Sequence, residues 1–344
     1  MIQFQCDYNE GAHPLIMQRL VETNMHQTVG YGEDDFCAVA RRLIRQACNR
    51  DDVDVHFLVG GTQTNATVIA HTLRPYQGVI SAVTGHINVH ETGAIEATGH
   101  KVLAIDSADG KLTAVQIEQA VQAHLHEDGP EHMVQPGMVY ISFPTEVGTI
   151  YTLGELRDIS TVCRRHGLPL FVDGARLGYG LCSPQSDVTL PQLAQLADVF
   201  YIGGTKVGAL FGEAVVIANQ ALKRDFRYSI KRHGGMLAKG RLLGIQFATL
   251  FADGLYMQIS RHAIAQAMRI RQALQAQGIP FLIDSPTNQQ FPIFSKAQLE
   301  TLGQKYRFSF WQQIDAEHAA VRICTSWGTK SENVDSLIAD IKKL

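Results

Sequence analysis

The sequence predicts an α/β protein: a large domain built on a mainly parallel, doubly wound sheet, followed by a smaller α+β domain. Short apolar runs alternate with helical stretches through the first two thirds of the chain, as they do in βαβ units. These runs are apolar almost throughout, which is typical of strands that helices cover on both faces. After about residue 235 the pattern changes to a long helical region and then to short extended segments. We therefore expect domains at 1–235 and 236–344.

Composition excludes several classes of function. The 344 residues are 45% apolar and 18% charged, as in a globular protein with a large core. A net charge of −3 gives no electrostatic case for binding nucleic acid or an anionic membrane, and no apolar run approaches the length of a membrane span. The six cysteines form no C-x-x-C pair, and the start lacks the apolar segment of a signal peptide. We expect a cytoplasmic protein with reduced thiols and without a metal site.

The individual elements follow from periodicity. Apolar residues at helical spacing predict two N-terminal helices, at 13–25 and 34–48. Seven strands are predicted at 54–59, 78–83, 100–105, 137–143, 168–174, 198–204 and 213–219. Helices are predicted between strands at 113–125 and 153–167. In the second domain we expect one helix over roughly 236–277 and a final helix with Ser331 as its N-cap.

Three chemically distinct groups follow three of the predicted strands. Ligands of such sheets bind at the carboxyl ends of the strands. "GGTQTN" (60–65) opens a helix, where backbone N–H groups form an anion site. "VDGAR" places Asp173 at the end of a buried strand, and "GGTKVGALFGEA" places Lys206 in an apolar, glycine-rich turn. Each has an ordinary alternative: a capped strand-to-helix turn, an Asp–Arg ion pair, and a lysine whose amine reaches water.

Taken together, the three groups indicate a cofactor site. Pyridoxal 5'-phosphate needs a phosphate cradle, an acid opposite its pyridine nitrogen and a lysine amine that forms a Schiff base. A lysine in an apolar site has a lowered pKa, which favours its nucleophilic form. His86 and His90 are four residues apart beside Glu91, but this order fits no known zinc motif. We therefore expect pyridoxal phosphate and no metal.

The same segments resemble a known family over nearly the whole chain. "CDYNEGAHP", "VGYGEDD", "GGTQTN", "VDGARL" and "GGTKVGALFGEA" are similar to motifs of the low-specificity threonine aldolase / β-eliminating lyase family. These are fold type I pyridoxal-phosphate enzymes of the aspartate aminotransferase superfamily. The resemblance implies a mainly parallel seven-stranded sheet in the large domain, a smaller C-terminal domain, and a homodimer or homotetramer with its active site at the subunit interface.

The resemblance also implies a role for each matching residue. Lys206 would carry the Schiff base, Asp173 would bond the pyridine nitrogen, and Arg176 would lie near the cofactor and the substrate carboxylate. The phosphate would be held by Gly61, Thr62 and Gln63, with Thr205 in place of the family's serine. His86, in "TGHINVHETGA", would stack on the ring. Cys6, Tyr31 and Arg322 would contact the amino acid substrate.

Two segments depart from the family pattern. Cys6 stands where the family has a serine, and "FPTEVGT" (143–149) places Glu146 where the family has a histidine near the substrate hydroxyl. Glutamate needs a raised pKa to act as a base near neutrality. The catalytic base is therefore left open among His86, Glu146 and a water molecule.

The expected activity is that of a pyridoxal-phosphate lyase. We expect an aldolase that cleaves β-hydroxy-α-amino acids, such as threonine, allo-threonine and phenylserine, to glycine and an aldehyde. The alternative with the same cofactor is β-elimination from another amino acid, because the same electron sink serves both reactions. A non-catalytic α/β binding protein is a third possibility, and it would form no Schiff base.

Overall fold

Seven strands form the central sheet of the large domain, in the order β2-β8-β7-β6-β5-β3-β4. The computed structural model describes residues 1–344. The strands are β2 (Asp54–Leu58), β3 (Gln77–Ala82), β4 (Val102–Ile105), β5 (Gln135–Ser142), β6 (Leu170–Asp173), β7 (Val199–Gly203) and β8 (Glu213–Ile217). Every predicted strand is present. β3 to β7 pair in parallel, whereas β8 runs antiparallel to both β2 and β7, so the prediction of a mainly parallel sheet is confirmed.

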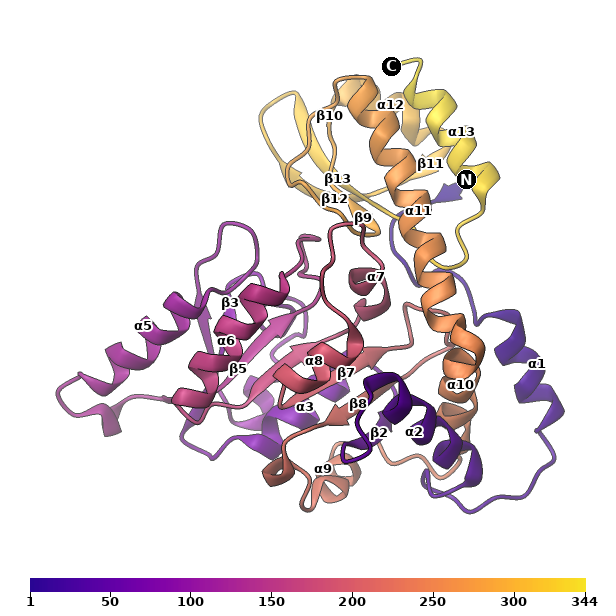
Figure 1. Cartoon of the computed structure of the whole chain (residues 1–344). Coiled ribbons are helices and arrows are strands. Elements are labelled where there is room, and N and C mark those ends of the chain that lie inside the picture. The colour runs from indigo at the N-terminus through magenta and orange to yellow at the C-terminus, as the bar shows by residue number, and fades with distance from the viewer.

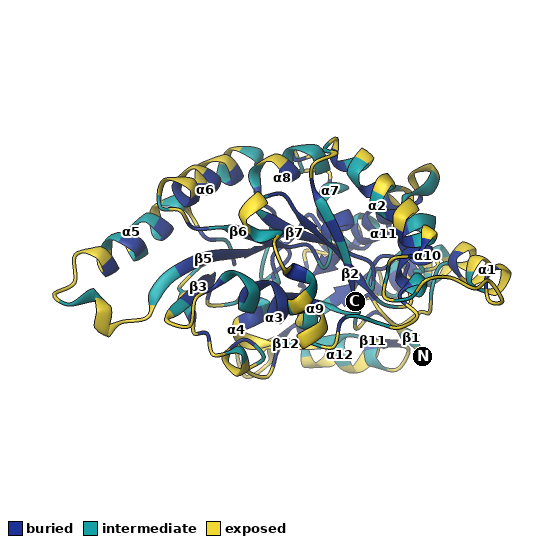
Figure 2. Ribbon diagram, turned by 90° about the horizontal axis from the view of Figure 1, so that it is seen from below, coloured by how far each residue is buried: buried dark blue, intermediate teal, exposed yellow.

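Helices cover both faces of this sheet, as Figure 2 shows. The helices of the large domain are α1 (Pro14–Glu22), α2 (Asp35–Cys48), α3 (Gly61–Thr72), α4 (His86–Val89), α5 (Ala114–Leu125), α6 (Leu153–Arg165), α7 (Leu177–Leu181), α8 (Leu190–Leu196), α9 (Phe226–Arg232) and α10 (Arg241–Phe251). Short 3-10 helices lie at Glu96–Thr98, Pro130–His132, Gln220–Leu222 and Ala252–Gly254.

Side chains of each strand alternate between two apolar cores. In β8, Ala214 and Val216 belong to the core under α2, α5, α6, α8 and α10. Val215 and Ile217 belong to the core under α3 and α9. Successive side chains of a strand point to opposite faces, so each buried strand contributes to both cores. This explains why the strands read as continuous apolar runs rather than as alternating ones.

A second, smaller unit lies at one end of the molecule, where Figure 1 shows the two chain termini close together. Its elements are α11 (Leu255–Ala276), β9 (Gln289–Gln290), β10 (Ile293–Ser295), α12 (Lys296–Gly303), β11 (Tyr306–Arg307), β12 (Ser309–Gln313), β13 (His318–Cys324) and α13 (Ser331–Ile341). β1 (Ile2–Gln3) pairs in parallel with β11, and Phe4 packs in the same core as Ile270 and Ile341. The N-terminal residues thus pack with the C-terminal ones.

Two details of the C-terminal half differ from the sequence predictions. The single helix expected over 236–277 is two helices, because Asp253 (φ 52°) and Gly254 (φ 71°) adopt left-handed backbone conformations between α10 and α11. Ser331 is the first residue of α13, and Lys330 occupies the N-cap position without a capping side chain. The Ser331 hydroxyl accepts a hydrogen bond from Gln266 instead.

The stretch Arg241–Ala276 is long and apolar enough, by length and composition, to cross a membrane. The apolar runs of the sequence predict no such stretch. Half of the residues in its most apolar 18-residue segment are buried within the protein. Helix α10 packs against α2 and contributes Leu243, Phe247 and Leu250 to the large core. These helices are therefore explained by core packing.

Candidate active site

Functional side chains gather at the carboxyl edge of the central sheet around two adjoining cavities. The inner cavity, of about 300 Å³, includes Gly61, Thr62, Asp173 and Thr205 in its lining. The outer cavity, of about 570 Å³, extends to Arg322 in the smaller unit. Five residues line both cavities: Tyr8, His86, Glu146, Arg176 and Lys206. The strand ends of the large domain and β12 and β13 of the smaller unit thus build one site.

The first turn of α3 offers free hydrogen-bond donors to the inner cavity. Gly60 precedes the helix and has no capping side chain, and the N–H groups of Gly61, Thr62 and Gln63 have no acceptor within the protein, since the first helical bond is Thr64 N–H to Gly60 O. Such a helix start binds anions. The Gln63 side chain points elsewhere: its oxygen accepts from Val59 N–H and its amide donates to His233 O.

Asp173 is held as a buried carboxylate. Its oxygens accept hydrogen bonds from Tyr201 (2.5 Å), Tyr140 (2.6 Å), Asn65 (3.1 Å) and the Ala175 N–H (3.0 Å). Burial alone would raise the pKa of Asp173, but His86 and the tyrosine donors outweigh burial and lower it. The carboxylate is therefore charged, and it faces the inner cavity.

Lys206 lies in the turn after β7, and its amine makes no hydrogen bond or ion pair within the protein. Burial lowers the pKa of Lys206, helped by the Arg176 charge and opposed by Asp7 and Asp173. The turn is fixed by Tyr179, whose hydroxyl donates to the Lys206 carbonyl at 2.6 Å. A lysine with a lowered pKa supplies a neutral, nucleophilic amine more readily.

Arg176 forms a buried ion pair with Asp7 and not with Asp173. Its guanidinium donates to both carboxylate oxygens of Asp7, at 2.6 and 3.1 Å, and Asn288 donates to the same carboxylate at 2.9 Å. Burial opposes the charge of Asp7, but Arg176 outweighs it and lowers the pKa of Asp7. This interaction joins the N-terminal segment, the turn after β6 and the smaller unit at one point.

His86 and Glu146 lie together at the boundary of the two cavities. The His86 ring nitrogen Nδ1 is 2.8 Å from the buried carboxylate of Glu91, and the His86 backbone N–H donates to Glu146 Oε1. Ser142 also donates to Glu146 Oε1, at 2.5 Å, whereas Glu146 Oε2 has no partner in the protein. Burial raises the pKa of Glu146, and the charge of Asp173 raises it further. The geometry thus leaves one carboxyl oxygen of Glu146 free to face a ligand.

Arg322 lines the outer cavity, and each of its two Nη groups keeps one N–H donor unpaired within the protein. Its two Nη groups donate to Gln289 Oε1 (3.3 Å) and Gln5 O (3.1 Å), and its Nε is buried without an acceptor. The guanidinium lies 5.6 Å from the ring centroid of Trp311, which holds it by a cation–π contact. This arrangement presents an arginine that can bind a carboxylate.

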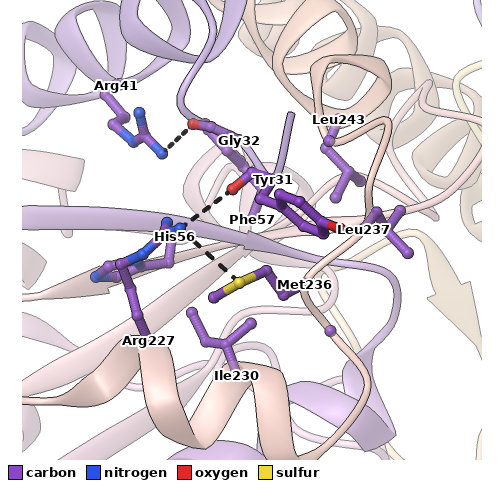
Figure 3. Close-up of a pocket in the computed structure, with 12 residues that line it drawn as sticks. Tyr31, Gly32, Arg41, His56, Phe57, Arg227, Ile230, Met236, Leu237 and Leu243 are labelled. Carbon is purple, nitrogen blue, oxygen red and sulfur yellow. Dashed lines mark hydrogen bonds between the residues drawn. The ribbon is translucent and has the colours of Figure 1, made fainter. Parts of the chain in front are cut away.

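Two predicted substrate contacts do not line either cavity. The Cys6 thiol donates to Asn9, and the neighbouring Tyr8 lines both cavities instead. Tyr31 lies beside a separate cavity of about 30 Å³, shown in Figure 3, where its carbonyl accepts from Arg227 and Lys231 lies over its ring. The other predicted residues, apart from the Gln63 side chain, line the two cavities.

Several residues of the site were missed by the sequence analysis. Tyr140, Tyr201 and Asn65 bond Asp173, and Glu91 orients His86. Glu213 lines the inner cavity because β8 runs antiparallel and so brings its first residue, not its last, to this edge. An acid that opens an otherwise apolar run, "EAVVIA", was the available signal.

The donor set fits pyridoxal phosphate. Unpaired N–H groups of α3 and the Thr205 hydroxyl match a phosphate group, the ionised Asp173 matches a protonated pyridine nitrogen, and the Lys206 amine matches an aldehyde. A side chain at position 61 would crowd Tyr201, because a Cβ there would lie 3.2 Å from the hydroxyl that donates to Asp173. All of these groups line the one inner cavity.

Comparisons with known proteins agree with this chemistry. The family described as Beta-eliminating lyase matches residues 6–309. Low specificity L-threonine aldolases from a Pseudomonas strain and from Pseudomonas aeruginosa are each 31% identical, over 99% of this chain and 97% of theirs. A solved structure of Leishmania major threonine aldolase is 45% identical with a TM-score of 0.97, covering 100% of this chain and 99% of that chain. The fold is shared with Thermus thermophilus aspartate aminotransferase (TM-score 0.72, 12% identity), over 100% of this chain and 91% of that chain. The chain therefore belongs to the threonine aldolase / β-eliminating lyase family and is a pyridoxal-phosphate-dependent lyase.

Proposed function

We propose that this protein is an aldolase that cleaves β-hydroxy-α-amino acids of the threonine, allo-threonine and phenylserine type to glycine and an aldehyde. The observation that carries the proposal is the meeting of a free anion cradle, an ionised Asp173, the Lys206 amine and Arg322 around two joined cavities. Relatives described as low specificity L-threonine aldolases support the substrate class.

Each residue then has a specific task. Gly61, Thr62 and Thr205 hold the phosphate group, and Asp173 keeps the pyridine nitrogen protonated. The bound cofactor supplies an electron-poor ring that accepts the electron pair of the bond broken at Cα. Arg322 binds the substrate carboxylate and so sets which bond at Cα faces that ring. Asp7 balances the charge of Arg176, but the Arg176 Nη1 group has no acceptor in the protein and offers further N–H donors to a ligand in the two cavities.

Glu146 is the base in this proposal. Its free Oε2 would take the proton of the substrate β-hydroxyl while the Cα–Cβ bond breaks and the aldehyde leaves. A proton delivered to Cα would then give glycine. His86, which Glu91 fixes at Nδ1, would stack on the cofactor ring, and its backbone N–H orients Glu146. Catalysis by a positioned base typically contributes about 10²- to 10⁴-fold to the rate.

A substrate panel tests the reaction. Purified protein loaded with pyridoxal phosphate is offered threonine, allo-threonine, phenylserine and cysteine-type amino acids, and the products are identified. Aldehyde and glycine in equal amounts support the aldolase. Ammonia and a 2-oxo acid, which is pyruvate for the cysteine-type amino acids, would instead establish β-elimination. The departure of segment 143–149 from the family pattern motivates this alternative.

Replacing Glu146 by glutamine separates the base from cofactor binding. We expect kcat for retro-aldol cleavage to fall by about 10²- to 10⁴-fold, with cofactor affinity unchanged. A base acts when ionised, and burial raises the pKa of Glu146 above its usual 4.5. Activity of the unchanged protein should therefore fall as pH drops through that raised pKa, and this acid limb should be lost in E146Q. Glu96→Gln, an exposed acid, is the control. Full activity in E146Q would assign the base to His86 or water.

Replacing Arg322 by methionine tests carboxylate binding. A charge-assisted hydrogen bond contributes about 1.5–3 kcal/mol, so kcat/KM should fall about 10- to 150-fold, mostly through KM. The exposed Arg307, which lies on the neighbouring β11, provides the matched control Arg307→Met. Unchanged KM in R322M would show that another group binds the carboxylate.

We also propose a homodimer or homotetramer with the active site at the subunit interface, in the cytoplasm. Large apolar side chains are exposed near the N-terminus, including Val21, Met25 and Val29, and such surfaces indicate contact with other chains. Tyr31 and the segment 224–241, which is rich in arginine and lysine, do not line the two cavities of the candidate site. In an oligomer they would reach a neighbour's site. All six cysteines are free thiols, as expected in a reducing compartment. Light scattering of the purified protein would measure the mass of the assembly.

A further inference from the structure

Glu213 is a buried carboxyl group that none of the steps above uses. It is the first residue of β8 and is 3% exposed. β8 pairs with β2, where Glu213 lies opposite Leu58, and with β7, where it lies opposite Gly203. β2 leads into Gly60–Thr62 and β7 leads into Thr205 and Lys206. Glu213 therefore lies between the two turns that form the anion cradle.

The side chain of Glu213 points to the face on which the cradle lies. Val215 and Ile217, its same-face neighbours along β8, pack in the core that includes residues of α3. Glu213 lines the inner cavity together with Gly61, Thr62 and Thr205. Its Oε2 accepts a hydrogen bond from the Gly204 N–H at 3.0 Å, which holds the carboxyl group beside the cradle.

This position would bring the Glu213 carboxylate close to a second anionic group, the bound phosphate. A phosphate monoester carries about −1.5 to −2 charges at pH 7, because its second pKa is about 6. Two anionic groups that share a buried site disfavour one another's charged forms. The free N–H groups of α3 compensate part of the phosphate charge, but a second, ionised carboxylate would need compensation of its own.

We propose that Glu213 belongs to the phosphate cradle and carries a proton when the phosphate group is bound, so that cofactor binding takes up one proton from solvent. This inference rests on the proposed cofactor site. The proton stays on a carboxyl oxygen, which then acts as a neutral donor in the cradle, and no covalent bond changes.

The groups around Glu213 are consistent with a proton taken up near neutrality. Lys206 and Tyr201 face it from β7 and its following turn, Asp173 from β6, and Tyr256 from α11. Burial raises the pKa of Glu213 to about 7, opposed mainly by the charge of Lys206. At pH 8 and above the carboxyl group is therefore largely ionised without phosphate.

Binding of pyridoxine 5'-phosphate tests the proposal without involving the Lys206 reaction, because this compound has no aldehyde. Its affinity is measured from pH 7 to 9 for the full-length apoprotein and for Glu213→Gln. With a pKa near 7, the protonated fraction of Glu213 falls from about a half to about 1% over this range. The association constant of the unchanged protein should therefore fall up to about 50-fold more than that of E213Q, because any proton taken up by the pyridine nitrogen opposite Asp173 is common to both proteins.

Calorimetry in two buffers of different ionisation enthalpy measures the proton directly. We expect the unchanged protein to take up close to one proton more than E213Q at pH 8. Thr62→Val is the matched control, since it removes a hydroxyl group from the cradle without touching a partner of Glu213, and it should weaken binding equally at every pH.

Equal pH slopes in the unchanged protein and E213Q, or absence of proton uptake by the unchanged protein, would overturn the proposal. The second of these outcomes would overturn it even if E213Q does not fold. Failure of the proposed function has a different signature, since pyridoxal phosphate would then not attach to Lys206 at any pH, whereas failure of the present inference leaves that attachment intact.

Discussion

Lys206→Ala is expected to lose at least about a thousandfold in kcat, which corresponds to about 4 kcal/mol of transition-state stabilisation. Lys206 is the one lysine that lines the two cavities, and its lowered pKa suits it to react with an aldehyde. The variant should also fail to retain cofactor covalently after borohydride reduction. Absorbance spectra before and after reduction, followed by peptide mapping, measure both effects.

Lys343→Ala provides the control for this variant, because Lys343 is an exposed residue of the C-terminus. It should keep full activity and covalent labelling at Lys206. A borohydride-stable label in K206A, mapped to another lysine, would contradict the assignment of the reactive amine.

Asp7→Asn is expected to lower the free energy of unfolding by about 3–5 kcal/mol, because it leaves the buried Arg176 guanidinium without a counter-charge. Neither side chain can turn to water: Asp7 is fully buried and the Arg176 side chain is 12% exposed. The loss would be measured by urea denaturation at neutral pH and constant protein concentration.

Two further variants isolate the cause of that loss. The double variant Asp7→Leu with Arg176→Met removes both charges and should recover much of the stability, since apolar replacement of a buried pair is often neutral or better. Glu22→Ala breaks the exposed Arg19–Glu22 pair and should cost less than about 1 kcal/mol. If D7N loses no more than E22A, the buried pair is not a source of stability.

Most of the site could be predicted from the sequence because its chemically distinct residues come directly after predicted strands. Asp173, Lys206 and the glycine turn at 60–61 each follow an apolar run, so the rule for parallel sheets places them at one edge. The position of Glu213 could not be predicted by that rule, because the direction of a strand depends on the strands that it pairs with and not on its own residues. The role of Glu91 was equally hidden, since its contact with His86 depends on how the chain turns after α4.

The remaining differences between prediction and structure concern backbone turns, which the spacing of apolar residues does not reveal. Apolar spacing continues across 252–254, so the break between α10 and α11 is visible only in the Asp253-Gly254 dipeptide, a turn signal. Tyr31 was assigned to the site by resemblance, but its left-handed backbone (φ 61°) and that of Gly32 carry it to another surface of its own chain. Contacts of this kind depend on tertiary structure, or on a second subunit.

The hydrogen bond between Asp7 and Asn288 joins residues 281 positions apart, and it has a consequence for how the protein is made. A ribosome releases residue 7 long before residue 288, and domains emerging first usually fold first. The central sheet can thus form during synthesis, but the N-terminal segment must wait unpaired until β11 and β13 have emerged. We expect pulse-labelled nascent chains stalled before residue 288 to be cut by protease near the N-terminus, and released full-length chains to be protected there.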